Sequence, residues 1–195
     1  MKTKTRCRWA GTDPLYIRYH DTEWGVPVHD DMKLSEFLIL ESAQAGLSWI
    51  TILKKRENYR NAFDNFDPRK IAAYNSDKIK ALVSDKGIIR NQKKIESAVC
   101  NAKAFLAVQK EFGSFDAYIW QFTEGISVKN RWKKHEDIPS KTEISVAMSN
   151  DLKKRGFQFL GPTICYAFMQ AVGMVNDHTA DCFRYDEICT FGRKK

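Results

Sequence analysis

Residues 151–169 read DLKKRGFQFLGPTICYAFM, and this stretch decides the fold. A predicted helix ends at Arg155, a tight turn runs from Gly156 to Gly161, and Pro162 takes the favoured first position of a second helix. Gly156 suits a helix C-cap with positive φ, and Gly161 permits close approach of another backbone. Free N–H groups at the start of the second helix would form an anion site, helped by basic residues at 153–155. An ordinary helical corner with solvated charges would show the same spacing, so the pattern alone leaves both interpretations open.

Helical signals extend outward from this hairpin over nearly the whole chain. Asp13-Pro14 and Asp67-Pro68 each combine a capping residue with proline at the first helical position, which predicts a helix after each pair. Further helices are expected after the caps Asp30 or Asp31, Ser48 and Ser76, and over residues 91–110 and 114–122. Residues 125–140 are the least regular, and the segments 26–29 and 127–128 are too short to build a sheet. The sequence therefore predicts an all-α fold in a single domain, residues 1–195, built as one body or as two helical lobes with a pocket between them.

Composition and charge narrow the class of protein. The net charge is +8 with 43% hydrophobic residues, which favours a globular protein with phosphate-bearing partners, although many proteins are basic for solubility alone. No apolar run approaches the ~18 residues of a membrane span. The basic start, Met1 to Arg8, is followed by no apolar stretch, so we expect a cytoplasmic protein without a secretory signal. The odd number of cysteines, five, then indicates reduced thiols rather than a disulfide framework.

Four candidate metal ligands lie near the two ends of the sequence. Cys7 and His20 are close to the start, and His178 and Cys182 follow near the end with His-x-x-x-Cys spacing. That spacing would place both side chains on one face of a helical turn. Two thiolates and two imidazoles would complete a closed tetrahedral zinc site, which would tie down segments that otherwise fray. Alternatively, His20 is a surface histidine and Cys7 packs as a small hydrophobic residue.

A carboxylate lies among aromatic residues in the first fifty positions. Glu41 falls on the apolar side of its predicted helix, three residues after Leu38 and four after Phe37. Glutamate is rarely buried without a partner, so its place indicates a pocket. A carboxylate beside aromatic faces suits a flat cationic heterocycle, although Glu41 could instead point outward or pair with an arginine. The aromatic candidates are Tyr16, Tyr19, Trp24 and Trp49.

Several stretches together resemble one family. They are Asp-Pro-Leu-Tyr-Ile at 13–17, Tyr-His-Asp at 19–21, Glu-Trp-Gly-Val-Pro at 23–27, Ala-Gly-Leu-Ser-Trp-Ile-Thr at 45–51, Leu-Lys-Lys-Arg-Glu-Asn-Tyr-Arg at 53–60, Gly-Ile-Ile-Arg at 87–90, Gly-Pro-Thr-Ile-Cys-Tyr at 161–166 and Val-Asn-Asp-His at 175–178. The matches extend from Cys7 to Cys182, and their combination is far more specific than any single motif. On these residues the chain resembles the constitutive, type I family of bacterial 3-methyladenine DNA glycosylases.

The resemblance implies a helix-hairpin-helix DNA glycosylase fold with one structural zinc per chain joining the N- and C-terminal segments. It implies that Glu41 and the four aromatic residues form the base pocket, and that the loop carrying Gly46 and Leu47 presses into the gap left by a flipped nucleotide. The hairpin around Gly156 and Gly161 would grip one DNA backbone. Thr163 stands near the position where lyase-active relatives carry lysine, so no Schiff-base chemistry is implied.

The function implied is monofunctional excision of 3-methyladenine from double-stranded DNA with alkylated bases, by a monomer in a bacterial cytoplasm. The alternative is a non-catalytic DNA-binding protein that uses the hairpin and the zinc as a scaffold. Arg8 departs from the family pattern with an expected effect on local packing only, whereas the departures at Ser42 and Ala43 leave contacts near the DNA gap open. Asp177 lies near the place where the wider superfamily often carries an aspartate, but the family that the chain resembles does not depend on that aspartate, so we do not assign it to the site.

Overall fold

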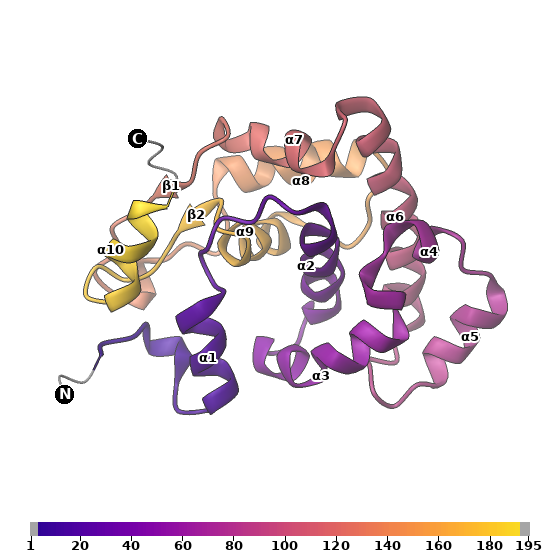
Figure 1. Cartoon of the computed structure of the whole chain (residues 1–195), viewed down its shortest axis with the longest axis horizontal. Helices are drawn as coiled ribbons and strands as arrows, with labels where there is room; N and C mark the ends of the chain where they lie inside the picture. The colour runs from indigo at the N-terminus through magenta and orange to yellow at the C-terminus, as the bar shows by residue number, and fades with distance from the viewer. Residues whose placement is uncertain (1–3, 192–195) are drawn as a thin grey trace.

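The computed structural model describes residues 4–191 and is mostly helical (Figure 1). Residues 1–3 and 192–195 of the predicted domain lie outside the described residues. The α-helices are α1 (Pro14–Thr22), α2 (Asp31–Gln44), α3 (Trp49–Ala62), α4 (Pro68–Ala72), α5 (Ser76–Ser84), α6 (Gln92–Phe112), α7 (Phe115–Ile119), α8 (Glu143–Lys154), α9 (Pro162–Ala171) and α10 (Phe183–Thr190). The 3-10 helices are η1 (Arg8–Ala10), η2 (Asp64–Phe66), η3 (Trp120–Thr123) and η4 (His135–Asp137), and the strands are β1 (Val128–Lys129) and β2 (Val175–Asn176).

The predicted helix starts are confirmed where aspartate precedes proline. The Asp13 carboxylate accepts the backbone N–H of Leu15 at 2.9 Å, and the Asp67 carboxylate accepts that of Arg69 at 2.9 Å. These caps satisfy donors that the first helical turn leaves unpaired. The prediction for α5 is wrong by one residue, because Asn75 is the cap, and its side-chain carbonyl accepts the N–H three residues on, at Lys78.

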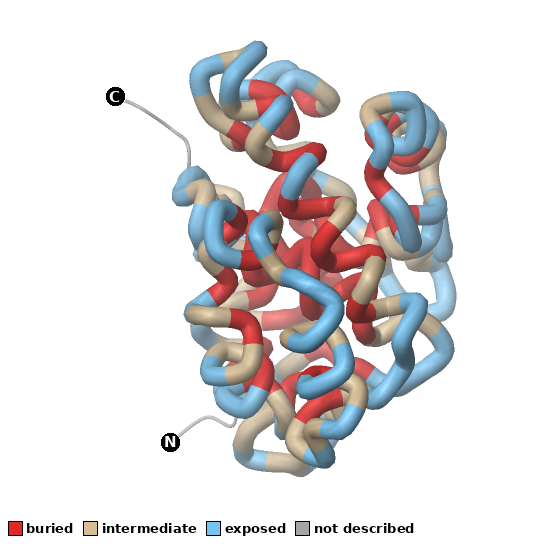
Figure 2. The backbone as a smooth tube through the Cα atoms, turned by 90° about the vertical axis from the view of Figure 1, so that its right-hand side faces the viewer, coloured by how far each residue is buried: buried red, intermediate tan, exposed pale blue. Residues whose placement is uncertain are grey.

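Helix α2 forms the centre of the molecule. It packs against α3, α6, α7 and α9, and every residue from Leu34 to Ala43 is buried. Figure 2 shows the buried backbone gathered in the middle of the molecule, with exposed segments around it. Because α2 is covered on all sides, the polar residues within it must find partners inside the protein or face an internal cavity.

The hairpin predicted between α8 and α9 is confirmed. Gly156 has φ +91°, and it ends α8 in a Schellman motif: its N–H donates to Lys153 O, and the N–H of Phe157 donates to Leu152 O. Asn101 of α6 braces the turn, because its side chain both donates to Gln158 O and accepts the Gln158 N–H.

Gly161 occupies the N-cap of α9. Its φ is −68°, and a Cβ added there would meet no atom within 4 Å. The packing of this chain therefore does not require glycine at this position, and the space beside it is open to an outside group.

Two features of the fold were not predicted. Strands β1 and β2 pair in parallel, with Val128 opposite Val175. The sequence predicted no sheet, and this prediction is wrong because the two short strands form one. No local signal indicates α10, which follows Cys182 directly. The pairing of β1 with β2 depends on contact between segments about fifty residues apart, which local patterns do not encode.

No helix within residues 4–191 has both the length and the apolar character needed to cross a bilayer. The described N- and C-terminal segments lie on the same side of the molecule, which also holds α1 and α10 (Figure 1). The fold thereby brings together chain segments that are more than 150 residues apart in sequence.

Candidate active site and metal cluster

A cavity of about 220 Å³ lies between α1, α2, α3 and α9. This volume is below the range of about 300–1,000 Å³ typical of sites for drug-sized ligands, so the cavity suits a single heterocyclic base. The structure brings all five residues of the expected pocket to this one cavity. They are Tyr16 and Tyr19 from α1, Trp24 from the segment after it, Glu41 from α2 and Trp49 from the start of α3.

Aromatic rings form the walls of the cavity. Trp9 lies at ring-centroid distances of 4.9 Å from Tyr16 and 4.8 Å from Trp24, and Tyr19 lies 5.5 Å from Trp49. These pairs are tilted or edge-on, an arrangement in which the rings hold one another in place. The walls are therefore preformed, and little side-chain freedom remains to be lost when a flat ligand enters.

Among the described residues, Glu41 is the one acidic side chain that lines this cavity. It is 3% exposed, and neither its Oε2 atom nor the Trp49 Nε1 atom has a hydrogen-bond partner among the described residues. Burial raises the pKa of Glu41 to about 8. Burial also raises the pKa of Tyr19, with the Glu41 carboxylate adding to the effect. A buried polar group without a partner is costly, so this carboxyl group is free to bind a polar group that enters the cavity.

Sequence patterns missed six further residues of the cavity wall. Gln170 is the most informative, because its side-chain amide donates to Asp177 at 2.8 Å, which fixes the orientation of the side chain. Since a carboxylate only accepts hydrogen bonds, the amide nitrogen of Gln170 must face Asp177. Gln170 lies three residues after Ala167 on α9, and this spacing, which places both on one face of the helix, was the signal that the sequence contained. The six are Trp9, Gln44, His135, Ile138, Ala167 and Gln170.

Asp177 itself is buried and is not among the described residues that line the cavity. Besides Gln170, it accepts hydrogen bonds from Asn130, Trp132 and Tyr166, at 2.6–2.7 Å. Four donors satisfy this carboxylate, so its place in the structure is that of a brace between α9 and the irregular segment 125–140.

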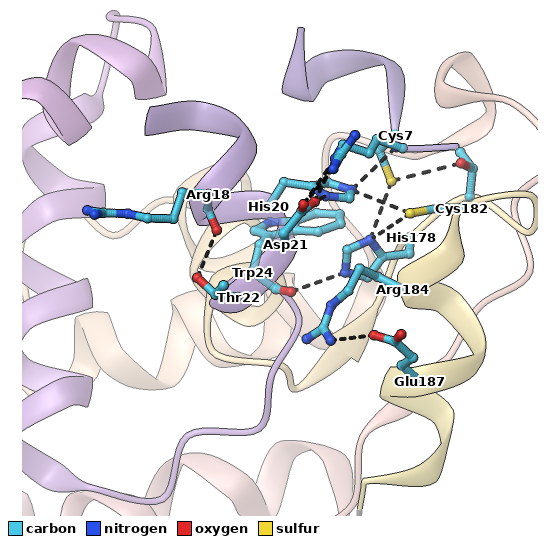
Figure 3. Close-up of polar contacts among 12 residues, drawn as sticks. Cys7, Arg18, His20, Asp21, Thr22, Trp24, His178, Cys182, Arg184 and Glu187 are labelled. Carbon is cyan, nitrogen blue, oxygen red and sulfur yellow. Dashed lines mark hydrogen bonds and ion pairs between the residues drawn. The ribbon is translucent and has the colours of Figure 1, made fainter. Parts of the chain in front are cut away.

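The four candidate metal ligands form one buried cluster next to Trp24, whose ring lies 4.6 Å from that of His178. Figure 3 shows Cys7 and His20 meeting His178 and Cys182 there. Their ligand atoms all lie within 4.8 Å of one another. Cys7 Sγ and Cys182 Sγ are each 3.5 Å from His178 Nδ1, and Cys182 Sγ is 3.4 Å from His20 Nε2.

These separations fit a tetrahedral metal ion. With the usual Zn–S and Zn–N bond lengths of about 2.3 and 2.0–2.1 Å, a tetrahedron separates sulfur from nitrogen ligands by about 3.5 Å. The second nitrogen of each imidazole is also occupied, by the Asp21 carboxylate for His20 and by Trp24 O for His178. Such outer contacts orient histidine ligands in metal sites. The donor set and its surroundings therefore fit a closed metal site.

The two thiols are electronically distinct. The pKa of Cys182 is lowered, first because the Cys7 thiol donates a hydrogen bond to it and then because the two imidazoles face it. The same contact and burial raise the pKa of Cys7. One thiolate is thus favoured within the cluster, and a cation would favour the second.

The helical turn expected for His178 and Cys182 is wrong. Both residues precede α10 in a non-helical turn, in which the Cys182 N–H donates to Thr179 O at 2.8 Å. A tight turn brings residues four apart as close as a helix does, so the two ligands still meet. Sequence spacing alone does not distinguish these two conformations.

The loop after α2 and the hairpin both lie at the surface. Gly46 has φ +78°, and the Leu47 side chain is 39% exposed although it is apolar. Near the hairpin, Lys153 and Lys154 are exposed, whereas Arg155 pairs with Glu111 and Asp151 at 2.8 and 2.9 Å. Two of the three basic residues expected beside the hairpin are therefore available to an outside partner. Arg8, which departs from the family pattern, is likewise exposed and pairs with Glu136.

Comparisons with known proteins agree on one family. The model of the methyladenine glycosylase family matches residues 9–185. DNA-3-methyladenine glycosylase of Haemophilus influenzae is 51% identical over 178 residues, which cover 91% of this chain and 96% of that protein. A crystal structure of 3-methyladenine DNA glycosylase I superposes with a TM-score of 0.90 at 50% identity, covering 92% of this chain and 98% of the other. A variant of 3-methyladenine DNA glycosylase I in complex with 3-methyladenine is 36% identical with a TM-score of 0.90, covering 92% and 97%.

Proposed function

Because this chain belongs to the methyladenine glycosylase family, we propose that it removes 3-methyladenine from alkylated DNA by hydrolysing the N-glycosidic bond, as a base-excision repair enzyme. The observation that carries this proposal is the unpaired Glu41 carboxyl group inside an aromatic cavity of base size. A protein that only held DNA would need the basic surface but no such cavity, which speaks against the non-catalytic alternative.

Base recognition follows from the groups that line the cavity. Methylation at N3 gives the nucleoside a formal positive charge, and aromatic faces attract a desolvated cation. Tyr16, Tyr19, Trp24 and Trp49 supply those faces. The Glu41 carboxylate accepts hydrogen bonds from the base, and a cationic ligand favours its ionised form, which burial otherwise disfavours. Ionising the buried Glu41 costs free energy, and a cationic base beside it offsets this cost whereas neutral adenine does not. The site therefore selects a charged, alkylated base over normal adenine.

DNA handling is assigned to two surface elements. Flipping a nucleotide costs a few kcal/mol of unstacking and unpairing. The exposed apolar side chain of Leu47, presented by the turn at Gly46, is suited to fill the vacated place in the base stack. The hairpin at Gly156 and Gly161 offers backbone N–H groups at the N-terminus of α9 to a phosphate. Phosphate contacts of this kind position a protein without reading sequence.

The chemical step needs little further help, because N3 methylation already weakens the glycosidic bond. The neutral base leaves with the bonding electron pair, and water adds to C1′ of the oxocarbenium-like sugar and loses a proton to solvent, which gives an abasic site. Thr163, near the position where lyase-active relatives carry lysine, cannot form a Schiff base. The enzyme is therefore monofunctional.

We assign the metal cluster to one structural zinc, held by Cys7, His20, His178 and Cys182. Zinc would supply cross-linking of the chain ends rather than Lewis-acid chemistry, since four protein ligands fill a tetrahedral site. Two ligand rings also support the cavity wall: His178 lies 4.6 Å from Trp24, and His20 lies 5.2 Å from Trp9. The cluster thus stabilises the side of the base pocket that α1 and the segment before it provide.

The substrate is assigned as double-stranded DNA, and the working form as a monomer in the bacterial cytoplasm. The net charge of +8 supports a polyanionic partner.

The deciding experiment measures base release from methylated DNA. Purified protein is incubated with duplex DNA treated with a methylating agent, and released bases are separated by chromatography. We expect free 3-methyladenine from the wild type and a loss of about 10- to 100-fold with Glu41→Gln, as for removal of one charge-assisted hydrogen bond. Binding of the variant to undamaged DNA should stay at the wild-type level. Absence of 3-methyladenine from the wild-type reaction would refute the proposed function.

A further inference from the structure

The side chain of Lys94 binds the loop that carries Gly46 and Leu47. Lys94 lies in the first turn of α6, and its Nζ atom is 2.8 Å from Ala43 O and 2.6 Å from Ala45 O. The side chain is half-buried, and burial lowers its pKa. Both acceptors lie at the C-terminal end of α2, where a cation is favoured by the helix dipole and by carbonyls without intrahelical partners.

The backbone between Gln44 and Leu47 forms a type II β-turn. Ala45 has φ −42° and ψ 116°, Gly46 has φ +78°, and the Leu47 N–H donates to Gln44 O at 2.6 Å. Positive φ at the third position explains the glycine. The carbonyl of the central peptide, Ala45 O, takes no part in the turn's own hydrogen bond, and Lys94 is the group that binds it.

This contact fixes the direction of the central peptide. In a planar trans peptide the C=O and N–H groups point in opposite directions. Because Lys94 holds Ala45 O toward α6, the Gly46 N–H points away from α6, on the exposed side of the loop. A flip of this peptide would convert the turn to type I, withdraw Ala45 O from Lys94 and reverse the Gly46 N–H.

We infer that Lys94 is a positioning residue for the DNA-inserting loop: it selects the turn conformation that presents Leu47 and the Gly46 N–H to duplex DNA. This inference rests on the proposed function, because it assigns the loop to the flipped-nucleotide gap. Lys94 is not among the residues that line the base cavity, so its influence is exerted through the loop.

The chain offers a matched control in Lys93, the neighbouring residue of α6, whose side chain is exposed. Lys94→Met and Lys93→Met remove the same charge from adjacent positions. We expect single-turnover excision of 3-methyladenine from duplex DNA to fall about 10-fold in Lys94→Met and less than about 2-fold in Lys93→Met, as for loss of a charge-assisted hydrogen bond at only one position. Lys94→Arg keeps cationic N–H donors and should restore most of the rate.

Two further measurements separate positioning from a general loss of structure. Binding of free 3-methyladenine, followed by tryptophan fluorescence, should be unchanged in Lys94→Met because the cavity is intact. Amide NMR signals of Gly46 and Leu47 should shift or broaden in Lys94→Met and stay in place in Lys93→Met.

The outcomes distinguish this inference from the proposed function. If the wild type releases no 3-methyladenine, the proposed function fails, and the NMR comparison still decides whether Lys94 sets the turn. Equal excision by Lys94→Met and Lys93→Met would overturn the positioning role. Loss of free-base binding in parallel with excision, or unchanged Gly46 and Leu47 signals in Lys94→Met, would overturn it as well.

Discussion

Replacement of Glu41 by glutamine should make the folded protein increasingly more stable than the wild type as the pH rises. The Glu41 side chain is almost fully buried, and burial raises its pKa from 4.5 to about 8. Glutamine has nearly the same size and helix propensity but no proton to release. The substitution therefore isolates the free-energy cost of ionising this one carboxyl group.

The sign follows from proton binding in the two states. The folded wild type keeps the Glu41 proton up to about pH 8, whereas the unfolded chain releases it near pH 4.5. The stability that this proton contributes is complete below pH 4.5 and is lost as the pH rises through 8, at about 1.4 kcal/mol per pH unit between the two values. Relative to Glu41→Gln, the wild type thus loses about 4 kcal/mol of unfolding free energy between pH 5 and pH 9.

Denaturant unfolding of both proteins at pH 5, 7 and 9 measures this difference directly. Glu36→Gln is the matched control, because Glu36 is also a buried glutamate of α2. Burial opposes the ionisation of Glu36, but hydrogen bonds from Arg56 and Lys33 outweigh this effect and lower its pKa. Removing its charge leaves the buried Arg56 guanidinium with Glu23, at 2.7 Å, as its remaining carboxylate partner, and should destabilise the protein at pH 7 by about 1.5–3 kcal/mol. A stability difference between Glu41→Gln and wild type that is equal at pH 5 and pH 9 would refute the argument that Glu41 is a desolvated acid.

Further predictions concern the reaction, the metal and the hairpin. The kcat/KM for excision should rise with pH up to about 8 in the wild type and lose this dependence in Glu41→Gln, because the ionised carboxylate is the form that binds the cation. Elemental analysis should find one zinc per chain, and Cys182→Ser should lose it and melt lower by on the order of 10 °C, whereas Cys100→Ser, outside the cluster, should do neither; a metal-free wild type would count against the site. Gly161→Asp should weaken binding to DNA of every sequence alike in filter-binding assays, since it places a negative charge where a phosphate is expected; normal binding would make the hairpin a structural corner only.

Much of the fold could be predicted because the signals are local. Capping by Asp13 and Asp67 and the C-cap at Gly156 each depend on a few neighbouring residues, and the structure confirms all three. The error at α5 has the same origin, since Asn75 and Ser76 are adjacent residues that can both cap a helix. The pairing of β1 with β2 depends instead on tertiary contacts that no local pattern carries.

The candidate site divides in a similar way. Aromatic residues and Glu41 attract attention because their types are unusual for their positions, and they do lie around one cavity. Gln170 and Lys94 were missed because glutamine and lysine are ordinary on helices, and only the fold shows that one contacts Asp177 and the other holds Ala45 O. The metal ligands could be proposed from residue type, but the turn that joins His178 to Cys182 could not.

The metal cluster also sets the time at which a newly synthesised chain can complete its fold. His20 contacts Cys182, which is made 162 residues later. At the usual bacterial-to-eukaryotic range of about 5–20 residues per second, the first pair of ligands waits about 10–30 s on the ribosome for the second pair. Helix α9, which supplies Ala167 and Gln170 to the cavity, also arrives in the last part of synthesis. A nascent chain therefore carries half of the Cys and His cluster and an open-sided pocket until its final segments emerge, and completion of the cluster is among the last steps of its folding.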